Sequence, residues 1–231
     1  MTDNSKDEFI EIARIKEEFI ANASHELKTP IASVRLAAES ALTSLERDDG
    51  MTKSFLEQIL RDSDRMNELI SDLLDLSAME SSDVFMEAFD LHDVIANEIS
   101  YLSKQNKKRI SYKKKKVEIN ANFDDISLAV KNLIKNALKY SPPEENILVQ
   151  IEENDKSVRC SFQDFGSGIS ESDQEKIFER FYRVDKGRSR KVGGTGLGLA
   201  IVKHALDRNN AVIEIVSELD HGSNFTIVFE K

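Results

Sequence analysis

The stretch Ser24 to Pro30 (SHELKTP) combines residue types that could do nucleophilic chemistry. The imidazole of His25 has the side-chain pKa nearest neutrality, so it can act as a nucleophile without a strong base. Glu26 could accept the proton of the other ring nitrogen. Pro30 lacks a backbone donor and is expected to loosen a helix beside His25. Taken alone, the stretch also fits a surface histidine on a charged helix.

Glycine is concentrated in two short windows. The chain has nine glycines, and six of them lie in Asp164 to Ile169 (DFGSGI) and Gly193 to Leu199 (GGTGLGL). Clustered glycines indicate backbone that approaches something closely. The second window precedes a predicted helix that extends to about Arg208, and the free N–H groups of a helix start suit a phosphate chain. Its spacing matches neither a P-loop nor a dinucleotide fingerprint.

A third candidate lies on a predicted amphipathic helix. Asn132 and Asn136 are four residues apart, so both amides project from one face. Asparagine is a neutral-to-poor helix former, which suggests another reason for the pair. Mg²⁺ takes few protein oxygens when phosphates supply the others, and one amide oxygen would suffice. Capping of a nearby loop is the structural alternative. Lys139 and Tyr140 follow at the end of the same helix.

Composition limits the class of protein. The net charge of −10 over 231 residues argues against a nucleic-acid binder, and Lys113 to Lys116 is interpreted as a solvated turn between strands. The one cysteine, Cys160, is expected to be buried in a protein from a reducing compartment. We find no apolar run of the ~18 residues that a membrane span needs and no signal peptide, so we expect a soluble chain.

Two long helices must position His25. Residues 7 to 46 have apolar positions at alternating steps of three and four, and a second such seam starts after a break at Asp48 to Gly50, with Thr52 as the N-cap. The seams predict an antiparallel hairpin that pairs with a second copy as a four-helix bundle. A monomer packed on its own second domain is the alternative. The first seam includes Ile20, Leu27, Ile31, Val34, Ala41 and Leu45, and the second Leu56, Ile59, Met66, Ile70 and Leu73.

The second half of the chain predicts an α+β layered domain. We expect three domain ranges: a hairpin at 1–80, a linker at 81–90 and a second domain at 91–231. Helices are expected at 91–104, 124–140 and 196–208, and strands at 117–122, 146–153, 157–163, 211–217 and 223–230.

Taken together, these segments resemble the cytoplasmic catalytic core of a bacterial sensor histidine kinase. Five stretches match in the family's order: Phe19 to Pro30 (FIANASHELKTP), Asn132 to Pro142 (NLIKNALKYSP), Asp164 to Ile169 (DFGSGI), Ile177 to Arg183 (IFERFYR) and Gly193 to Ala200 (GGTGLGLA). The resemblance implies an α/β-sandwich ATP-binding domain of the type shared by histidine kinases, topoisomerases and chaperone ATPases. One departure is Asp207 to Ala211 (DRNNA), where His-Gly-Gly is usual.

The resemblance also implies roles for single residues. His25 would be the phosphoacceptor, Glu26 its base, and Arg183 would neutralise charge on the γ-phosphate. Asn136 would hold Mg²⁺, and Thr29 would support dephosphorylation of the partner, against the alternative that it only bonds the His25 carbonyl. Residues 184 to 195 would form a lid. The remaining ATP-binding residues implied are Asn132, Lys139, Tyr140, Asp164, Gly166, Gly168, Gly194, Thr195, Gly196, Leu197 and Gly198.

The activity implied is ATP-dependent autophosphorylation of His25, followed by transfer to an aspartate on the receiver domain of a response regulator. The chain would act in the cytoplasm as a homodimer, and a longer protein could carry a membrane-anchored sensor. Two alternatives stay open: a scaffold that has lost catalysis, and a relative that hydrolyses ATP. The first is disfavoured because His25, Glu26, Asn136 and Asp164 are all present. The second would lack the hairpin.

Overall fold

The computed structural model describes residues 4–47, 50–184 and 194–231, and for residues 4–13, 15 and 16 it describes the backbone alone. The chain divides into two compact units. The first comprises the chain up to Ser71 together with Gly193–Thr195, and the second comprises Asp72–Val192 and Gly196–Lys231. Each unit is described by itself below.

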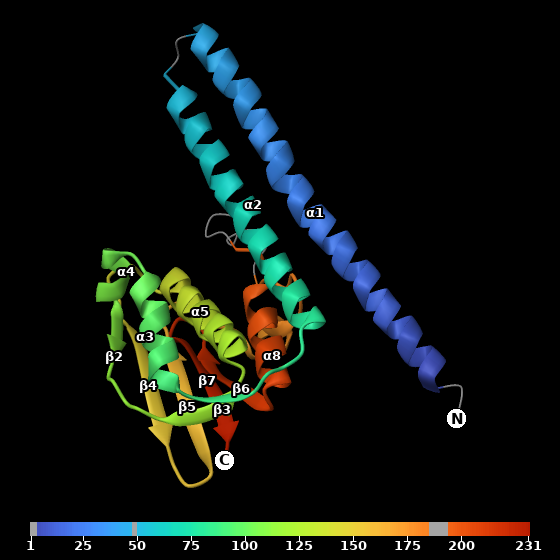
Figure 1. Cartoon of the computed structure of the whole chain (residues 1–231). Helices are drawn as coiled ribbons and strands as arrows, with labels where there is room; N and C mark the ends of the chain where they lie inside the picture. The colour runs from blue at the N-terminus through green and yellow to red at the C-terminus, as the bar shows by residue number, and fades with distance from the viewer. Residues whose placement is uncertain (1–3, 48–49, 185–193) are drawn as a thin grey trace. The chain divides into compact units, whose positions relative to one another are not determined.

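The first unit is a helical hairpin (Figure 1). Helix α1 spans Asn4–Arg47 and α2 spans Thr52–Ser81. Near the turn, the Thr52 hydroxyl donates to Ser44 Oγ at 3.1 Å. Further along, Ser33 Oγ donates to the carboxylate of Asp62 at 2.6 Å. The sequence separation of the paired residues increases with distance from the turn. The helices are therefore antiparallel, as the two seams predict.

Helix α1 buries small residues and leaves large apolar ones exposed, whereas α2 buries Leu69, Leu76 and Met79. Pro30, Ala37, Ala41 and Ser44 are buried on α1 within the single chain. The predicted seam is only partly inside, because Ile31 is 55% exposed. Exposed apolar side chains on both helices are Ile20, Ile31, Leu36, Leu42, Leu45, Leu56, Leu60, Ile70 and Leu74. Despite this apolar surface, neither these helices nor any other described helix has the length and hydropathy needed to cross a membrane.

Helix α1 passes through Pro30 without a break. Proline was expected to loosen the helix beside His25, but the helix is not interrupted there. Proline removes one N–H, its own, and α1 keeps the hydrogen bonds of the turns on both sides. The Thr29 hydroxyl adds a contact here, because it donates to the carbonyl of His25 at 3.3 Å.

The second unit is an α/β sandwich, as predicted. Its five-stranded sheet has the order β2-β4-β5-β7-β6 and is antiparallel except for the β2–β4 pair. A two-stranded antiparallel sheet, β1-β3, lies apart from it. The strands are β1 (Glu87–Asp90), β2 (Ile110–Tyr112), β3 (Glu118–Ala121), β4 (Ile147–Glu153), β5 (Ser157–Gln163), β6 (Ala211–Glu218) and β7 (Gly222–Glu230).

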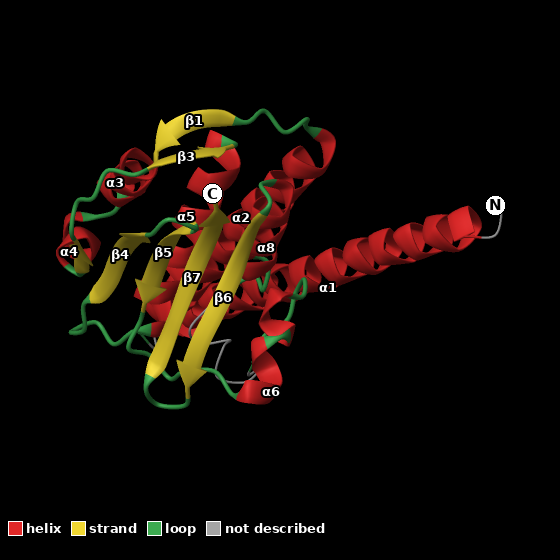
Figure 2. Ribbon diagram, turned by 90° about the horizontal axis from the view of Figure 1, so that it is seen from below, coloured by secondary structure: helices red, strands yellow, loops and turns green. Residues whose placement is uncertain are grey.

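Helices α5 and α8 lie against one face of the large sheet, and α3 packs beside α5 (Figures 1 and 2). Burial alternates along β5, where Val158, Cys160 and Phe162 point into this layer. Cys160 is fully buried, as expected, and burial raises the pKa of its thiol. The helical elements are α3 (Leu91–Tyr101), α4 (Lys104–Lys108), α5 (Phe123–Tyr140), α6 (Glu171–Gln174), the 3-10 helix η1 (Lys176–Phe178) and α8 (Gly198–Arg208).

The elements differ from the sequence prediction mainly between residues 81 and 112. Residues 87–90, in the stretch expected as a linker, form β1 and pair with β3. The helix expected at 91–104 ends at Tyr101, and α4 begins separately at Lys104. Strand β2 was not predicted, because three residues within a basic segment are too few to show alternation.

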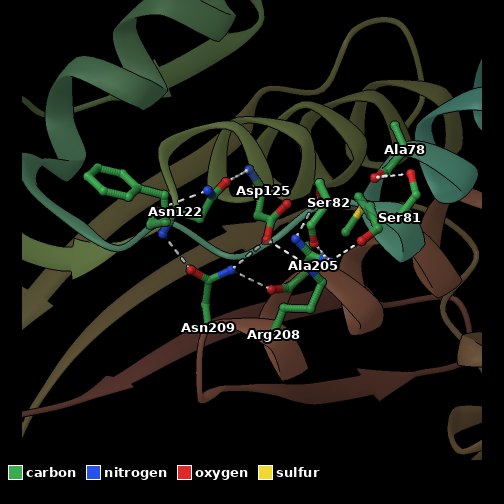
Figure 3. A network of polar contacts seen from close by, with 10 residues as sticks. Ala78, Ser81, Ser82, Asn122, Asp125, Ala205, Arg208 and Asn209 are labelled. Carbon is green, nitrogen blue, oxygen red and sulfur yellow. Dashed lines mark hydrogen bonds and ion pairs between the residues drawn. The ribbon is translucent and has the colours of Figure 1, made fainter.

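Polar side chains connect α5, α8 and the residues around the end of α2 (Figure 3). Buried Asp125 accepts from Arg208 Nε at 3.0 Å and from Asn209 Nδ2 at 3.1 Å. Arg208 also donates to the carbonyls of Met79 and Ser82. The stretch that departs from His-Gly-Gly thus has a structural use, and Asn210 (φ 51°) supplies the left-handed turn residue.

Candidate active site

His25 lies on α1 with its side chain exposed. A nucleophilic imidazole must reach its substrate, and this position allows that. Thr29, one turn along, is exposed as well, and its bond to the His25 carbonyl corresponds to the structural alternative considered for it. An exposed hydroxyl that donates once can still accept, so this bond leaves a second role open.

Glu26 points between the two helices of the hairpin rather than toward solvent. Its carboxylate forms an ion pair with Arg65 of α2 at 3.1 Å, with side-chain exposures of 29% for Glu26 and 20% for Arg65. Adjacent residues on a helix face different directions, which explains why Glu26 and His25 diverge. For Glu26 to act as a base, its carboxylate must either leave the ion pair with Arg65 or interact with His25 while the ion pair is kept.

The amide oxygens of Asn132 and Asn136 converge on the start of α8. A β-carbon placed on Gly198 would lie 3.0 Å from Asn132 Oδ1 and 4.0 Å from Asn136 Oδ1. Buried Asn132 is oriented by its amide nitrogen, which donates to the Leu128 carbonyl at 2.9 Å. The helix face and the second glycine window, predicted separately, therefore meet at one place.

The N-terminus of α8 has no side-chain cap: the N-cap is Leu197, which is fully buried and can offer a ligand only its backbone. Gly196 adopts a φ of 76° and lies against the backbone of Phe181, whose N–H donates to the Gly196 carbonyl at 2.8 Å. Uncapped N–H groups and the helix dipole favour an anion at this point. Gly194 (φ 114°) and buried Thr195 precede it in the chain.

Asp164 follows β5 and is 6% exposed. Its Oδ1 accepts from the N–H groups of Gly166 at 2.9 Å and Ser223 at 3.3 Å. Burial raises the pKa of Asp164, and these two hydrogen bonds partly counter that effect. Within the described parts of the chain, Oδ2 has no hydrogen-bond donor, so it can accept from the amino group of a bound base.

The glycines of the first window contact the protein's own backbone. A β-carbon on Gly166 would lie 2.5 Å from the Tyr140 carbonyl, and one on Gly168 (φ 65°) would lie 1.8 Å from the Glu218 carbonyl. Gly166 therefore brings the Asp164 loop against the end of α5. Gly168 joins the same loop to β6, which is a structural reason for glycine there.

Lys139 and Tyr140 occupy that end of α5. The Lys139 ammonium lies 5.3 Å from the centroid of the Tyr140 ring, and the ring is 48% exposed. The Phe165 N–H donates to Ser141 Oγ at 3.0 Å, which fixes the loop to the residue after α5. Ser141 was missed by sequence reasoning, because a serine before two prolines looks like an ordinary helix stop.

The segment from Ile177 to Arg183 is held in place by side chains. The Tyr182 hydroxyl donates to Asp173 at 2.6 Å, and hydrogen bonds from Ser170 and Tyr182 lower the pKa of Asp173. Arg180 pairs with Glu80 at 2.7 Å. Arg183 is partly buried at the end of this segment. The predicted lid at 184–195 falls mostly outside the described residues, which resume at Gly194.

A magnesium ion fits the donor set through an amide rather than through carboxylates. Among the residues that the structure describes, no group of three His, Cys, Asp or Glu side chains could hold a metal. The Asn136 oxygen faces the uncapped helix start where a phosphate would supply further oxygens. Mg²⁺ commonly binds through one or two protein oxygens and substrate phosphates, so this arrangement is adequate.

Two family models match the chain. Residues 15–82 match the His Kinase A (phospho-acceptor) domain, and residues 121–231 match the histidine kinase-, DNA gyrase B- and HSP90-like ATPase. The first range contains His25, Glu26 and Thr29. The second contains both asparagines, Asp164 and α8. The two matched ranges cover the two candidate sites in the order that the sequence indicates.

Curated relatives align over nearly the whole chain. The sensor-like histidine kinase SenX3 of Mycolicibacterium smegmatis is 33% identical over 92% of this chain and 56% of that protein. The phosphate regulon sensor protein PhoR of Pseudomonas aeruginosa is 35% identical over 95% of this chain and 51% of that protein. The chain thus spans about half the length of the curated relatives it matches.

A solved structure has the same fold. Histidine kinase ThkA, crystallised in complex with response regulator protein TrrA, superposes with a TM-score of 0.74 over 96% of this chain and 63% of that chain. Its sequence identity is 20%, so this likeness describes the architecture alone.

Proposed function

Because this chain belongs to the sensor histidine kinases, we propose that it transfers the γ-phosphoryl group of ATP to His25 and then to an aspartate of a response regulator. The observation that carries the proposal is the convergence of the Asn132 and Asn136 oxygens on Gly198 at an uncapped helix start. That geometry suits a nucleotide triphosphate with a divalent cation. An exposed histidine in the matched phospho-acceptor range supplies the acceptor.

The first step forms a phosphorus–nitrogen bond and breaks the bond between the γ-phosphorus and its bridging oxygen. A ring nitrogen of His25 attacks in line, ADP leaves, and the proton on the other ring nitrogen passes to Glu26. The chain's contribution is positioning and charge neutralisation. Mg²⁺, when bound through Asn136, supplies further neutralisation of the phosphate oxygens.

The proposal assigns a nucleotide contact to each residue of the site. Asp164 Oδ2 accepts from the adenine amino group, and the exposed ring of Tyr140 flanks the base. Lys139, Asn132 and the N–H groups from Gly196 to Gly198 hold the phosphates, and Gly194 and Thr195 belong to the same window. Arg183 neutralises charge that develops on the γ-phosphate. Gly166 holds the loop that presents Asp164 against the end of α5, beside Tyr140.

The partner in the second step is the receiver domain of a response regulator. Support comes from the crystallised complex of ThkA with its response regulator, a protein of the same fold. His25 is exposed on α1 and can be approached by such a domain. Thr29, exposed one turn along, orients a water for attack on the aspartyl phosphate and so gives a phosphatase activity.

The hairpin forms a homodimer through its exposed apolar side chains, including Ile31, Leu45 and Leu56. Paired hairpins bury these residues as a four-helix bundle. We propose that the activity is cytoplasmic, because ATP and a response regulator must both reach the chain. We propose that a membrane-anchored sensor supplies the stimulus.

Incubation with γ-labelled ATP and Mg²⁺ tests the proposal. The proposal predicts label that is stable in alkali and labile in acid, as expected for phosphohistidine, and its transfer to a cognate receiver domain. Release of labelled inorganic phosphate with no label on the chain would instead indicate an ATPase. No turnover despite tight ATP binding would indicate a scaffold.

A further inference from the structure

The Arg109 side chain donates hydrogen bonds to backbone carbonyls at and just after the end of α5. Its Nη1 donates to Leu138 at 3.2 Å, its Nη2 donates to Ser141 at 3.2 Å and to Pro142 at 2.7 Å, and its Nε donates to Glu145 at 3.2 Å. The last carbonyls of a helix have no partner within the helix, and Pro142 prevents its continuation. A guanidinium is the side chain whose planar set of donors can serve several acceptors at once.

The backbone of Arg109 is itself fixed on both sides. Its N–H donates to the carbonyl of Asn106 at 3.0 Å at the end of α4, and its carbonyl accepts from Ile147 N–H at 2.7 Å, where β2 begins to pair with β4. The guanidinium therefore extends from a rigid point of the sheet. Arg109 is partly buried, whereas the neighbouring Lys107, Lys108 and Lys113 of the basic segment are exposed.

The end of α5 is also held by the Asp164 loop. Phe165 N–H donates to Ser141 Oγ, and Gly166 is close to the Tyr140 carbonyl. The turn that carries Lys139 and Tyr140 is thus in contact with both the Arg109 guanidinium and the loop that presents Asp164. A change at Arg109 would alter the spacing between Tyr140 and Asp164, the two residues that contact the base in the proposed function.

From these contacts we infer that Arg109 is a positioning residue for the nucleotide: it fixes the last turn of α5 so that Lys139 and Tyr140 stand at the correct distance from Asp164. The inference rests on the proposed function for the nucleotide site. Arg109 itself does not contact the reacting atoms. Its loss should weaken nucleotide binding and leave the phosphoryl transfer step intact once ATP is bound.

The test compares Arg109→Gln with Arg109→Lys and with Arg208→Gln in the full chain. Arg208 is the matched control, because it also donates to backbone carbonyls and to Asp125, and its partners lie outside the nucleotide site. Three quantities are measured for each variant: the melting temperature, the Kd for MgADP by calorimetry, and kcat and KM for autophosphorylation.

Arg109→Gln should raise the Kd and the KM about tenfold while kcat at saturating ATP stays within about twofold. Lysine carries its donors on one atom and cannot reach all four carbonyls, so Arg109→Lys should be intermediate and gives the same answer if the glutamine variant does not fold. Arg208→Gln should lower the melting temperature with the Kd within about twofold of the parent.

Three outcomes would overturn the inference. An unchanged Kd in the Arg109 variants, with only a lower melting temperature, would leave a merely structural role. An equal rise of the Kd in Arg208→Gln would show that general destabilisation causes the effect. If the parent chain itself does not bind MgADP, the proposed function fails together with this inference. If the parent binds MgADP and Arg109→Gln binds it equally well, only the inference is refuted.

Discussion

The amide oxygen of Asn132 lies 3.0 Å from the point where Gly198 would carry a β-carbon. Residues 66 positions apart in the sequence therefore leave no room for a methyl group between α5 and α8. Because the Asn132 amide donates to the Leu128 carbonyl at 2.9 Å, the oxygen can move aside only by straining that hydrogen bond. This approach explains why glycine, the poorest residue for a helix interior except proline, stands at the first position of α8.

Gly198→Ala should for this reason weaken nucleotide binding without unfolding the chain. The added methyl displaces the Asn132 oxygen and narrows the phosphate site, and we expect about a tenfold rise in the Kd for ATP, or about 1.4 kcal/mol. Helix propensity favours alanine by up to about 1 kcal/mol, so the melting temperature should stay near that of the parent. Calorimetry and thermal melts check both. An unchanged Kd would mean that the amide moves freely.

The roles of Asn136 and Asp164 can be distinguished by measuring nucleotide binding with and without Mg²⁺. Asn136→Ala removes the amide oxygen proposed to hold Mg²⁺ and adds no charge beside the phosphates, and Asp164→Asn replaces the acceptor for the adenine amine with a donor on one side. Both variants should lose autophosphorylation. Only Asp164→Asn should raise the Kd for Mg²⁺-free ADP strongly, by about tenfold or more, or at least about 1.4 kcal/mol. Equal loss of Mg²⁺-free binding in the two variants would contradict these separate roles.

The exposed seam predicts a dimer that a single charge disrupts. Ile31→Lys places an ammonium among apolar side chains, and burying it without a partner costs several kcal/mol. Sedimentation should show the parent as a dimer at micromolar concentration and Ile31→Lys as a monomer. Thr43→Lys, at an exposed position on a different face of α1, is the control and should remain dimeric. A monomeric parent would refute the four-helix bundle.

Thr29→Ala should remove most phosphatase activity toward the regulator and leave autophosphorylation near normal. Thr43 provides a matched control, because its hydroxyl bonds to the Glu39 carbonyl at 3.0 Å just as Thr29 bonds to His25. Thr43→Ala should therefore have the same small effect on helix stability and keep the phosphatase activity. If Thr29→Ala lowers both activities together, its role is the structural one.

Much of the fold could be predicted from the chain because its patterns are local. The seams around Ile31 and Ile70 predict the hairpin, and the alternation around Cys160 predicts paired strands. Strand β2 was missed, since its pairing with β4 depends on a distant segment and only three residues take part. The burial of small residues inside the hairpin, with Ile31 left exposed, likewise depends on packing that periodicity alone does not resolve.

The candidate site likewise has residues that the sequence could predict and residues that only the fold brings into place. Asn132, Asn136 and Asp164 could be named from residue types and spacing, together with a family resemblance. Arg109 could not, because it is one of eight basic residues between Ser103 and Val117 and only the fold aims it at the end of α5. The ion pair of Glu26 with Arg65 was equally hidden, since the two residues are on different helices and 39 positions apart.

The central claim is that His25 accepts the phosphoryl group of ATP, and labelling of His25→Gln tests it most directly. His25 lies in the first unit, whereas Asn132, Asn136 and Asp164 lie in the second, so the variant should bind MgADP with the affinity of the parent. After incubation with γ-labelled ATP, the parent should carry acid-labile, alkali-stable label and His25→Gln should carry none. Label that persists in the variant, on His92, His204 or His221, would contradict the account.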